Sequence, residues 1–531
     1  MATGSHEFVR GVFMMSPDTQ SLKRIVIMGG GLTGWTAALA LAKGLRGLGI
    51  DIVVIDHPAH RQQDLHNEAT TPACVAFHRW LGLAENELVA ATGASFQLAS
   101  YFNAWSYARQ AYFMPYNDHG FMLNRIDFSH YVVGRHLQGH ALPYDDYSLA
   151  AVAAKHGRFW HPSVQESSLL STLHYGLCLN TASYANYLRE FALRLKVVHV
   201  EAEAVAIQQH HDGNIASLRL APLGNAQHYS GLTANREIAA DFYLDCSGAQ
   251  ARLIEKQLDV AWQSRVNTLP MTHVVSHARH IALNQTLPSH RELRTAAAGW
   301  IQTLGSQTHC EQQYFYHADF TSSELAARTL GDAENAQVKP LRSGRRASFW
   351  YKNCLALGEA AGSMGPLGAG HLHLVQSALL RFLQLLPAHL PAHYNAAEFN
   401  RLTHLEYDHI EDFHALHYYL AANNSHAKTN NDFWQNIHTN PLTDRLAYKL
   451  ALFKQRGHIP FYEGETFSAG MWTSLLLGNG YWPERTNPLI NTMDAHWVEQ
   501  QLESMKKRIA AAANAMPEQA LYLHQQQLSH T

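Results

Sequence analysis

The first clear pattern along the chain is an apolar run that breaks into glycines and then into a helical repeat. Residues 24–28 read Arg-Ile-Val-Ile-Met, three glycines follow, and residues 36–43 are rich in alanine and leucine. A second apolar run, residues 52–55, ends in Asp56. Short apolar runs bounded by glycine are typical of buried strands, and the Ala/Leu-rich stretch favours a helix. The pattern therefore predicts a strand, a tight turn, a helix and a second strand, in that order.

The rest of the chain interleaves strand-like and helical patterns, without a repeat or a long linker. Residues 197–206 and 215–220 alternate in polarity and predict a small antiparallel meander, and residues 240–248 and 354–362 indicate two further strands. We expect a helix around residues 372–386, a sheet within residues 271–320, and mainly helices from residue 399 onward. Ligands of doubly wound folds bind where strand ends converge. The ends at Gly29, Ser247–Gly248 and Gly358 are therefore expected to meet at one site; the alternative is that Gly248 and Gly358 are only turn glycines.

Gly29, Gly31 and Gly34 occupy the positions of a G-x-G-x-x-G motif at the predicted strand-to-helix turn. Backbone N–H groups at the start of such a helix attract a pyrophosphate, and the glycines let the backbone approach it closely. Asp56 follows about twenty residues later, where a carboxylate binds a ribose hydroxyl. The pattern predicts a dinucleotide site, and the alternative is an ordinary glycine-rich turn. A nicotinamide dehydrogenase carries the same motif, so that class is a further alternative.

Composition narrows the class of protein. Hydrophobic residues make up 47% of the 531 residues, enough for a large core, and a formal net charge of -3 argues against a nucleic-acid partner. Five cysteines without a C-x-x-C pair favour reduced thiols and a cytoplasmic location. No apolar run is long enough for a membrane span, and no signal-peptide pattern precedes Arg24. Residues 1–20 begin like a vector-derived tag and are expected to be a disordered start.

The 36 histidines suggest metal binding at first sight. They are scattered, however, and neighbouring pairs such as His371 and His373 lack acidic or cysteine partners at ligand spacing. We therefore expect no metal site.

Further motifs follow the glycine-rich turn in a characteristic order. They are Trp35 after the last glycine, Asn67-Glu-Ala-Thr-Thr-Pro72, the run Phe96, Phe102 and Trp105, Leu244-Asp-Cys-Ser-Gly248, Gly358-Glu359, Trp472, and Gly478-x-Gly480-x-x-Pro483. In this order the motifs, from Arg24 to about Met493, resemble the flavin-dependent tryptophan halogenases, a branch of the single-component FAD monooxygenases. The Asp-Cys-Ser-Gly and Gly-Glu-Ala-Ala elements argue against a nicotinamide dehydrogenase.

The resemblance implies a fold and a cofactor site. The fold class is α/β: an FAD-binding Rossmann-like domain, residues 21–400, with interleaved substrate-side segments near 95–190 and 265–330. A mainly helical region, residues 401–531, is expected to cover the substrate side. The resemblance implies these FAD-binding residues: Gly29, Gly31, Leu32, Thr33, Gly34, Trp35, Asp56, Glu68, Ala69, Thr70, Asp245, Ser247, Gly248, Gly358, Glu359, Leu367 and Gly370.

The chain departs from the family at the residues that carry its chemistry. Counting four residues from Pro72 places the family's catalytic lysine at Ala76, and no lysine lies between Lys43 and Lys155. His78 and Arg79 are close by, but we interpret both as helix-surface residues. The family's catalytic glutamate falls at Gly368. His78, His371 and His373 are the nearest weak candidates for acid–base work.

Two further departures concern the substrate side. In the family signature W-x-W-x-I-P, Trp300 is kept, but the second tryptophan is Gln302 and the proline is Gly305. This signature is thought to block ordinary monooxygenation near the flavin, so its loss relaxes that block. The glycine-rich stretch Gly368, Ala369 and Gly370 offers backbone amides to a small anion, although a plain tight turn is an equal alternative.

The resemblance predicts an FAD-dependent oxidoreductase that acts through a flavin C4a-hydroperoxide on an aromatic, indole-type or peptidyl substrate. A separate flavin reductase supplies reduced flavin, O2 is the co-substrate, and use of a halide is in doubt. Two alternatives stay open: an FAD-binding non-catalytic partner or maturation factor, and a halogenase with rewired residues. The sequence also leaves the choice between monomer and homodimer open.

Overall fold

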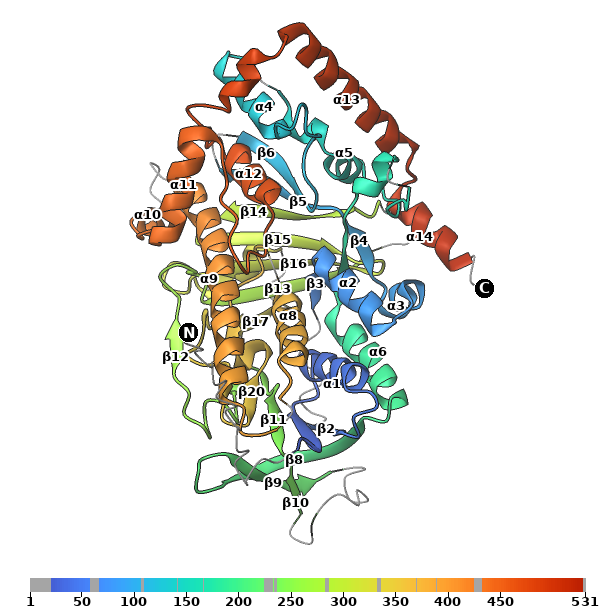
Figure 1. The fold of residues 1–531 in the computed structure, drawn as a ribbon, viewed down its shortest axis with the longest axis vertical. Helices are drawn as coiled ribbons and strands as arrows, with labels where there is room; N and C mark the ends of the chain where they lie inside the picture. The colour runs from blue at the N-terminus through green and yellow to red at the C-terminus, as the bar shows by residue number, and fades with distance from the viewer. Residues whose placement is uncertain are drawn as a thin grey trace, which may run out of the picture.

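The computed structural model describes residues 21–57, 66–106, 109–140, 142–165, 167–223, 233, 236–281, 286–331, 336–368, 370–387, 389–424 and 432–528. The expected tag, residues 1–20, and Ala369 of the expected anion site lie outside these residues. The molecule is elongated, with one large sheet at its lower end in Figure 1 and a second across its middle.

The lower sheet has eight strands and a parallel centre. Its order is β10 (Glu237–Ala239), β9 (Ile215–Pro222), β8 (Val198–Gln209), β2 (Asp51–Asp56), β1 (Arg24–Met28), β11 (Phe242–Asp245), β20 (Cys354–Ala356) and β19 (Trp350–Tyr351). The strands from β8 to β20 pair in parallel, and the outer pairs are antiparallel. The central strands β1 and β2 are buried along almost their whole length, and helices α1 (Leu32–Gly44), α6 (Thr181–Arg194) and α8 (His371–Gln384) lie over one face of the sheet (Figure 1).

The middle sheet has seven strands and is almost entirely antiparallel. Its order is β17 (Gln337–Pro340), β13 (His273–His280), β16 (His309–Tyr316), β15 (Gly299–Gly305), β14 (His290–Ala296), β5 (Ala99–Ser106) and β6 (Arg109–Pro115). Only the pairing of β14 with β5 is parallel. Two three-stranded sheets complete the β-structure: β12 (Trp262–Ser264), β18 (Gly344–Arg346) and β21 (Gly362–Ser363), and β3 (Asn67–Ala69), β7 (Gly176–Asn180) and β4 (Ser95–Gln97).

Helices dominate the upper end and the C-terminal third of the chain. The long helix α9 (His393–Asn424) runs along the left side in Figure 1, from the lower sheet past the middle one. The other α-helices are α2 (Pro72–Leu81), α3 (Glu85–Thr92), α4 (Phe128–Leu137), α5 (Leu149–Lys155), α7 (Ser323–Thr329), α10 (Asp432–His438), α11 (Asp444–Arg456), α12 (Ala469–Gly478), α13 (Ala495–Ala515) and α14 (Gln519–Leu528).

These elements confirm the fold class expected from the sequence. The predicted strand–helix–strand unit is β1–α1–β2, the predicted meander is β8–β9–β10, and the sheet expected within residues 271–320 is built by β13 to β16. Beyond residue 401 the described residues form helices and connections without a named strand. The division of the chain into domains at residue 400 stays a prediction.

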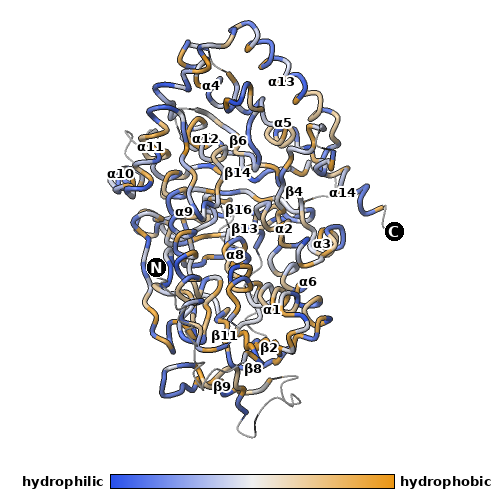
Figure 2. Tube along the Cα trace, viewed as in Figure 1, coloured by the Kyte–Doolittle hydropathy of each residue, from blue (hydrophilic) through white to orange (hydrophobic). Residues whose placement is uncertain are grey.

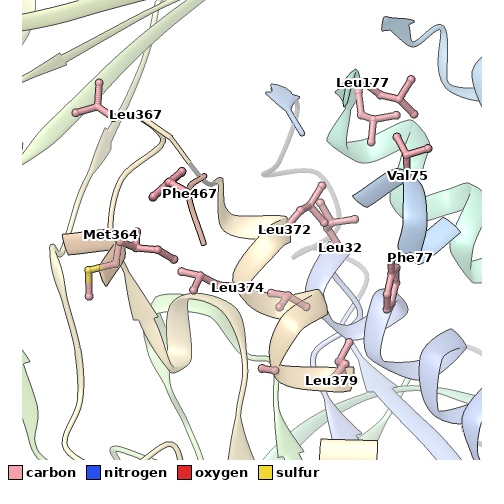
Figure 3. Packing of buried hydrophobic residues seen from close by; sticks show 14 of the residues in the cluster. Leu32, Val75, Phe77, Leu177, Met364, Leu367, Leu372, Leu374, Leu379 and Phe467 are labelled. Carbon is pink, nitrogen blue, oxygen red and sulfur yellow. The ribbon is translucent and has the colours of Figure 1, made fainter. Parts of the chain in front are cut away.

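The core is continuous from the lower sheet to the upper helices. Figure 2 shows strand β2 as largely hydrophobic, whereas α9 is largely hydrophilic although much of it is buried. Figure 3 shows the leucines of α8, among them Leu372 and Leu374, close to Leu32 of α1, with Phe467 beside the loop that carries Met364 and Leu367. This packing holds the starts of α1 and α8 close together, next to the ends of the central strands.

Candidate functional site

The glycine-rich turn after β1 leaves no room for side chains. Gly29 has a φ of +112°, and a Cβ there would lie 2.3 Å from the carbonyl oxygen of Cys246. A Cβ on Gly30 would lie 2.3 Å from Cγ of Asp56, and one on Gly34 would lie 1.8 Å from the carbonyl oxygen of Gly29. The turn therefore packs directly against β11, β2 and the start of α1.

The start of α1 has the features of a phosphate site. Gly31 is the N-cap residue, no side chain caps the helix, and its first turn contains no acidic residue. The free amides and the helix dipole both favour an anion there. Asp56 ends β2 beside this turn, almost fully buried, with Oδ2 3.5 Å from Nε2 of His199. The turn and the carboxylate thus fit the pyrophosphate and ribose of a dinucleotide.

The expected convergence of three strand ends is confirmed. Strands β1, β11 and β20 are neighbours, and their ends lead into Gly29, Ser247–Gly248 and Gly358. Asp245 is fully buried and shapes the second of these loops, since its carboxylate accepts hydrogen bonds from Ser247 Oγ at 2.6 Å and from the amides of Leu253 and Ile254 at 2.8 Å. A buried carboxylate with several donors is satisfied and rigid.

The third loop is held against α1 and the middle sheet. Gly358 has a φ of +64°, and a Cβ there would lie 2.6 Å from Thr33 Oγ1. Glu359 forms an ion pair of 2.9 Å with Lys339 of β17. Burial raises the pKa of Glu359, but Lys339, His371 and His66 together outweigh burial, so the pKa is lowered overall. Glu359 therefore presents a carboxylate at this edge.

One cavity of about 580 Å³ connects these features, a size typical of small-molecule and cofactor sites. The expected FAD residues in its wall are Gly29, Gly31, Leu32, Thr33, Asp56, Glu68, Ala69, Ser247, Gly248, Glu359 and Gly370. The other expected residues, Gly34, Trp35, Thr70, Asp245, Gly358 and Leu367, lie outside the wall. Trp35, for example, is buried with its ring centre 5.1 Å from that of His199, which indicates a packing role.

The start of α8 is already occupied by a carboxylate. Oε1 of Glu68 accepts a 2.9 Å hydrogen bond from the amide of Leu372, and a Cβ on Gly370 would lie 2.6 Å from the same oxygen. The amide of Gly368 donates to Nε2 of His414 at 2.9 Å. Two of the amides near the expected anion site therefore have partners, and Glu68 would repel an anion bound beside Gly370. Anion binding by Gly368, Ala369 and Gly370 stays a prediction that this geometry does not favour.

The positions proposed for catalysis are scattered. Ala76 is exposed on the outer face of α2, so a lysine there would extend into solvent instead of into the cavity. His371 does line the cavity, with Nε2 3.1 Å from Thr33 Oγ1. His373 lies outside the wall and pairs with Glu406 at 3.2 Å. Of the three candidate histidines, His371 alone reaches the cavity; any catalytic role stays a prediction.

The interpretation of His78 as a helix-surface residue is wrong. Its side chain is buried, with Nε2 2.6 Å from the Tyr184 hydroxyl and 3.5 Å from Sγ of Cys74, because this face of α2 packs on the core. Burial lowers the pKa of His78 to about 4, so the imidazole is neutral at pH 7. Arg79 is exposed, as expected.

The space beside Gly368 is filled by aromatic rings. A Cβ on Gly368 would lie 2.6 Å from Phe467 and 3.0 Å from Phe413, whose rings stack with centres 3.8 Å apart. A glutamate at this position has no room without displacing the pair. His414 anchors the same loop, since its Nδ1 donates to the carbonyl of Met364 at 2.8 Å while its Nε2 accepts from Gly368.

The middle sheet supplies the other wall of the cavity, and sequence reasoning found only part of it. Trp300 of β15 and Phe315 of β16 stack with ring centres 4.4 Å apart, and Trp300 Nε1 donates to the Tyr418 hydroxyl at 3.2 Å. Gln302 and Gln313 line the wall beside them. The alternation of β15 places Trp300 and Gln302 on one face, a signal that was available in the sequence; Phe315, Gln313 and Tyr418 required the pairing of distant segments.

Arg291 was also missed. It lies in the cavity wall, almost fully buried, and donates to Ser100 Oγ at 2.9 Å and to the carbonyls of Pro366 and Leu367 at 2.7 and 2.5 Å. Burial lowers its pKa from the usual range of arginine. No salt bridge joins Arg291 to a carboxylate in the described part of the chain, so it brings a positive charge to the Pro366–Leu367 loop.

The described residues contain no group of three or more His, Cys, Asp or Glu side chains placed to hold a metal ion. None of the described helices combines the length and the apolar character that a membrane span needs.

Comparisons with known proteins bear on the family of this chain. A model of the tryptophan halogenase family matches residues 24–495. The chain is 24% identical over 549 residues to the tryptophan 6-halogenase SttH of Streptomyces toxytricini, covering 95% of this chain and 98% of that protein. Among solved structures, BrvH, a flavin-dependent halogenase from Brevundimonas sp. BAL3, has a TM-score of 0.86 and 27% identity, covering 95% of this chain and 99% of that one. Xcc4156, a flavin-dependent halogenase from Xanthomonas campestris, has a TM-score of 0.86 and 28% identity, covering 95% and 98%. The chain therefore belongs to the tryptophan halogenase family, whose enzymes use FAD, a separate flavin reductase and O2, with a halide as co-substrate.

Proposed function

We propose that this enzyme uses reduced FAD and O2 to oxidise an aromatic, indole-type substrate without the Lys–Glu pair of its family. The observation that carries the proposal is a cavity whose wall includes both the glycine-rich turn and the aromatic residues of the middle sheet. A site built for FAD alone does not need an aromatic wall that includes Trp300, Phe315 and Tyr418. An aromatic substrate matches that wall by stacking and burial of apolar area.

The protein's own residues have three tasks in this proposal. The turn at Gly29–Gly31 and Asp56 bind the pyrophosphate and ribose, as their geometry allows. Glu359 and Lys339 form a charged edge where the two sheets meet. The buried aromatic wall excludes water and fixes the orientation of the ring. Bound FAD supplies the redox chemistry, which is the cofactor's own.

The experiment supplies the purified enzyme with FAD, a flavin reductase, a reduced nicotinamide, O2 and a panel of indoles, a tryptophan-containing peptide, and bromide. Mass spectrometry then follows the gain of an oxygen or a bromine atom. We expect substrate-dependent product, and we expect Trp300→Phe to lower kcat/KM by about tenfold through loss of ring contacts. Trp350→Phe is the control, because Trp350 is equally buried but lies outside the cavity. An enzyme that binds FAD but forms no product with any substrate would contradict the proposal and support the non-catalytic alternative.

A second candidate function is halogenation that relies on residues other than the lysine and glutamate of the family. The position of Arg291 favours this candidate. Its buried positive charge beside the Pro366–Leu367 loop provides electrostatic attraction for a halide or hypohalite in place of the missing lysine. Brominated product in the same assay, lost in Arg291→Gln while FAD still binds, would establish this candidate.

The proposal also covers the cellular location of the enzyme and the size of its substrate. The five cysteines are free thiols, which supports a cytoplasmic location. The peptide and the small indoles in the panel decide whether the ring belongs to a small molecule or to a peptide.

A further inference from the structure

Gln302 is a buried side chain in the cavity wall with one unused hydrogen-bonding group. Its exposed fraction is 3%, and its Oε1 has no hydrogen-bond partner among the described residues. A buried carbonyl without a partner destabilises the folded protein, so natural proteins rarely leave one without a reason. A bound ligand that donates a hydrogen bond is such a reason.

A chain of hydrogen bonds fixes which end of the Gln302 amide is unused. The chain starts at the backbone amide of Asn67, which is a donor without ambiguity and donates to Oε2 of Glu311. The other oxygen, Oε1 of Glu311, accepts from Nε2 of Gln313 at 2.7 Å. Because Gln313 turns its NH2 group toward the carboxylate, its Oε1 is left to accept from Nε2 of Gln302 at 2.6 Å. The carbonyl is therefore the end of the Gln302 amide that has no partner among the described residues, while its NH2 group already donates to Gln313.

The carboxylate of Glu311 is well suited to fix the direction of these hydrogen bonds. Glu311 is buried, and burial raises its pKa, but both oxygens accept from N–H donors and neither needs to donate. Asn67 replaces the glycine expected from the family motif, and Gln302 replaces a tryptophan. Only the second departure adds a side chain to the polar network, because Asn67 takes part through its backbone alone.

The surroundings of Gln302 indicate the shape of the ligand. Trp300 lies two residues earlier on the same face of β15 and stacks with Phe315. Its indole N–H already donates a hydrogen bond to the Tyr418 hydroxyl. Two almost fully buried, stacked rings therefore back the wall at this point, with one acceptor beside them that is unpartnered among the described residues. A planar ring that carries an N–H group matches both features.

We infer that Gln302 is a specificity residue whose carbonyl accepts a hydrogen bond from a ring N–H of the molecule bound against Trp300 and Phe315. The inference rests on the proposed function for the presence of such a ring in the cavity. Two sources have this chemistry, an indole-type substrate and the isoalloxazine ring of FAD, and both are flat and carry an N–H donor.

The test measures binding without turnover, so that it does not depend on the proposed reaction. Calorimetry on the FAD-saturated protein compares indole with benzothiophene, which has a similar shape but no N–H, and flavin fluorescence gives the affinity for FAD. We expect indole to bind on the order of tenfold more tightly than benzothiophene, as one hydrogen bond to a buried acceptor allows. Gln302→Leu is expected to abolish this discrimination while the affinity for FAD stays unchanged.

A different variant tests the direction of the hydrogen bonds from Glu311 to Gln302 and leaves Gln302 itself unchanged. Glu311→Gln lets both glutamines flip, so discrimination should fall several-fold without loss of the side chain itself. Gln312→Leu is the matched control, since Gln312 pairs with Thr303 in the β15–β16 register and lies outside the cavity wall. Thermal unfolding verifies that each variant is folded.

The measured affinities distinguish whether the substrate or the flavin donates the hydrogen bond to Gln302. Loss of indole discrimination alone assigns the donor to the substrate. A tenfold loss of FAD affinity in Gln302→Leu, with indole and benzothiophene equal in the unaltered enzyme, assigns it to the flavin. If neither affinity changes in a folded Gln302→Leu protein, the inference is overturned. Absence of product in the turnover assay, by contrast, counts only against the proposed function.

Discussion

Gly368 shows how a single residue separates this chain from the chemistry expected of its family. The absence of a side chain is matched by the stacked rings of Phe413 and Phe467, which occupy the space that a Cβ would need. The glycine and the phenylalanines form one packing arrangement, so restoring a carboxylate at this position alone would disrupt the loop before it could act.

This packing can be tested by substitution. We expect Gly368→Ala to lower the free energy of unfolding by about 1–3 kcal/mol, because the added methyl lies 2.6 Å from Phe467 and overpacks the site. Denaturant unfolding of Gly368→Ala, Phe467→Leu and the double variant gives a double-mutant cycle. A smaller effect of Gly368→Ala in the Phe467→Leu background is expected, whereas equal effects in both backgrounds would contradict the contact.

The buried histidines of α9 make stability depend on pH. Burial lowers the pKa of His414 from its ordinary value of 6.5 to about 4, and that of His417 to about 3. The unfolded chain therefore binds more protons than the folded protein between pH 6.5 and about 4, so the free energy of unfolding falls as the pH falls through that window. Protonated His414 could no longer accept from Gly368.

We expect the contribution of His414 to be on the order of 3 kcal/mol between pH 6.5 and 4. Urea unfolding of the wild-type protein and His414→Gln across this range measures it. The variant should lose less stability on acidification, because glutamine does not titrate. A pH dependence identical to that of the wild type would show that the Gly368 loop is not sensitive to the protonation of His414.

At the scale of elements, the sequence was informative where structure is local and poor where it depends on distant partners. The turn from Gly29 to Gly34 and the strand ending in Asp56 could be predicted because glycine spacing and apolar runs are local signals. The burial of one face of α2, which encloses His78 and leaves Ala76 exposed, could not, since it depends on packing against distant elements. The order of Glu311, Gln313 and Gln302 likewise depends on the pairing of β15 with β16.

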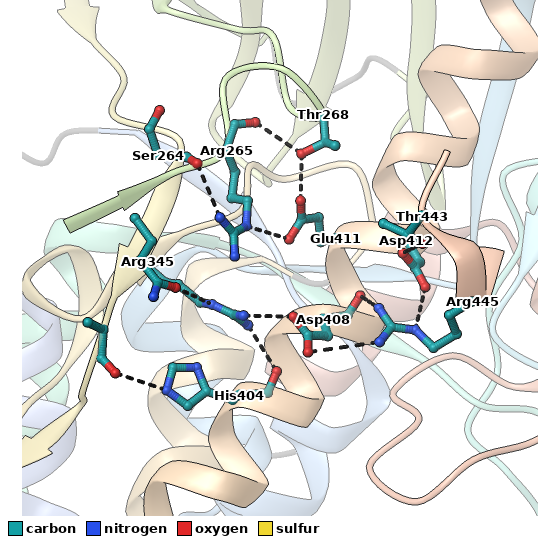
Figure 4. Close-up of polar contacts among 12 residues, drawn as sticks. Ser264, Arg265, Thr268, Arg345, His404, Asp408, Glu411, Asp412, Thr443 and Arg445 are labelled. Carbon is teal, nitrogen blue, oxygen red and sulfur yellow. Dashed lines mark hydrogen bonds and ion pairs between the residues drawn. The ribbon is translucent and has the colours of Figure 1, made fainter. Parts of the chain in front are cut away.

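Helix α9 is the clearest case of a misleading local signal. Its residues are largely hydrophilic (Figure 2), which suggests a surface helix, yet much of it is buried. Its carboxylates pair with arginines from several elements, as Figure 4 shows: Glu411 with Arg265, Asp408 with Arg345, and Asp412 with Arg445. Buried charges are tolerated only when they are paired, so these contacts allow α9 to cross from one sheet to the other.

Removing one partner of these α9 ion pairs should lower the free energy of unfolding. Asp412 is buried and accepts from Arg445 Nε at 2.6 Å and from Thr443 Oγ1 at 2.7 Å. We expect Asp412→Ala to lower the free energy of unfolding by about 2 kcal/mol, less than for a fully buried pair because Arg445 is partly exposed. Glu398→Ala is the control on the same helix, since the Glu398–Arg401 pair is exposed and its loss should leave the denaturation midpoint unchanged. Equal effects of the two variants would contradict a structural role for the buried network.

At the scale of the whole molecule, the cavity wall is assembled from both large sheets and from α9. Gly29 and Asp56 come from the lower sheet, Trp300 and Gln302 from the middle one, and Tyr418 from α9. A ligand that fills the cavity therefore contacts parts of the chain far apart in sequence. Because such a ligand binds the folded state and not the unfolded chain, it stabilises the whole protein.

FAD binding should therefore raise the unfolding temperature of the entire molecule in one transition. At a free concentration of one hundred times Kd, the expected stabilisation is about 2.7 kcal/mol. Gly30→Ala should abolish most of it, since its Cβ would lie 2.3 Å from Cγ of Asp56 and displace the carboxylate expected to bind the ribose. Gly305→Ala is the matched control, because a Cβ there has its nearest neighbour at 3.4 Å and lies outside the cavity wall. Scanning calorimetry with and without FAD measures the shift for each protein. A shift confined to one of two separate transitions would show that FAD contacts only the lower sheet, and an undiminished shift in Gly30→Ala would place the cofactor away from the glycine-rich turn.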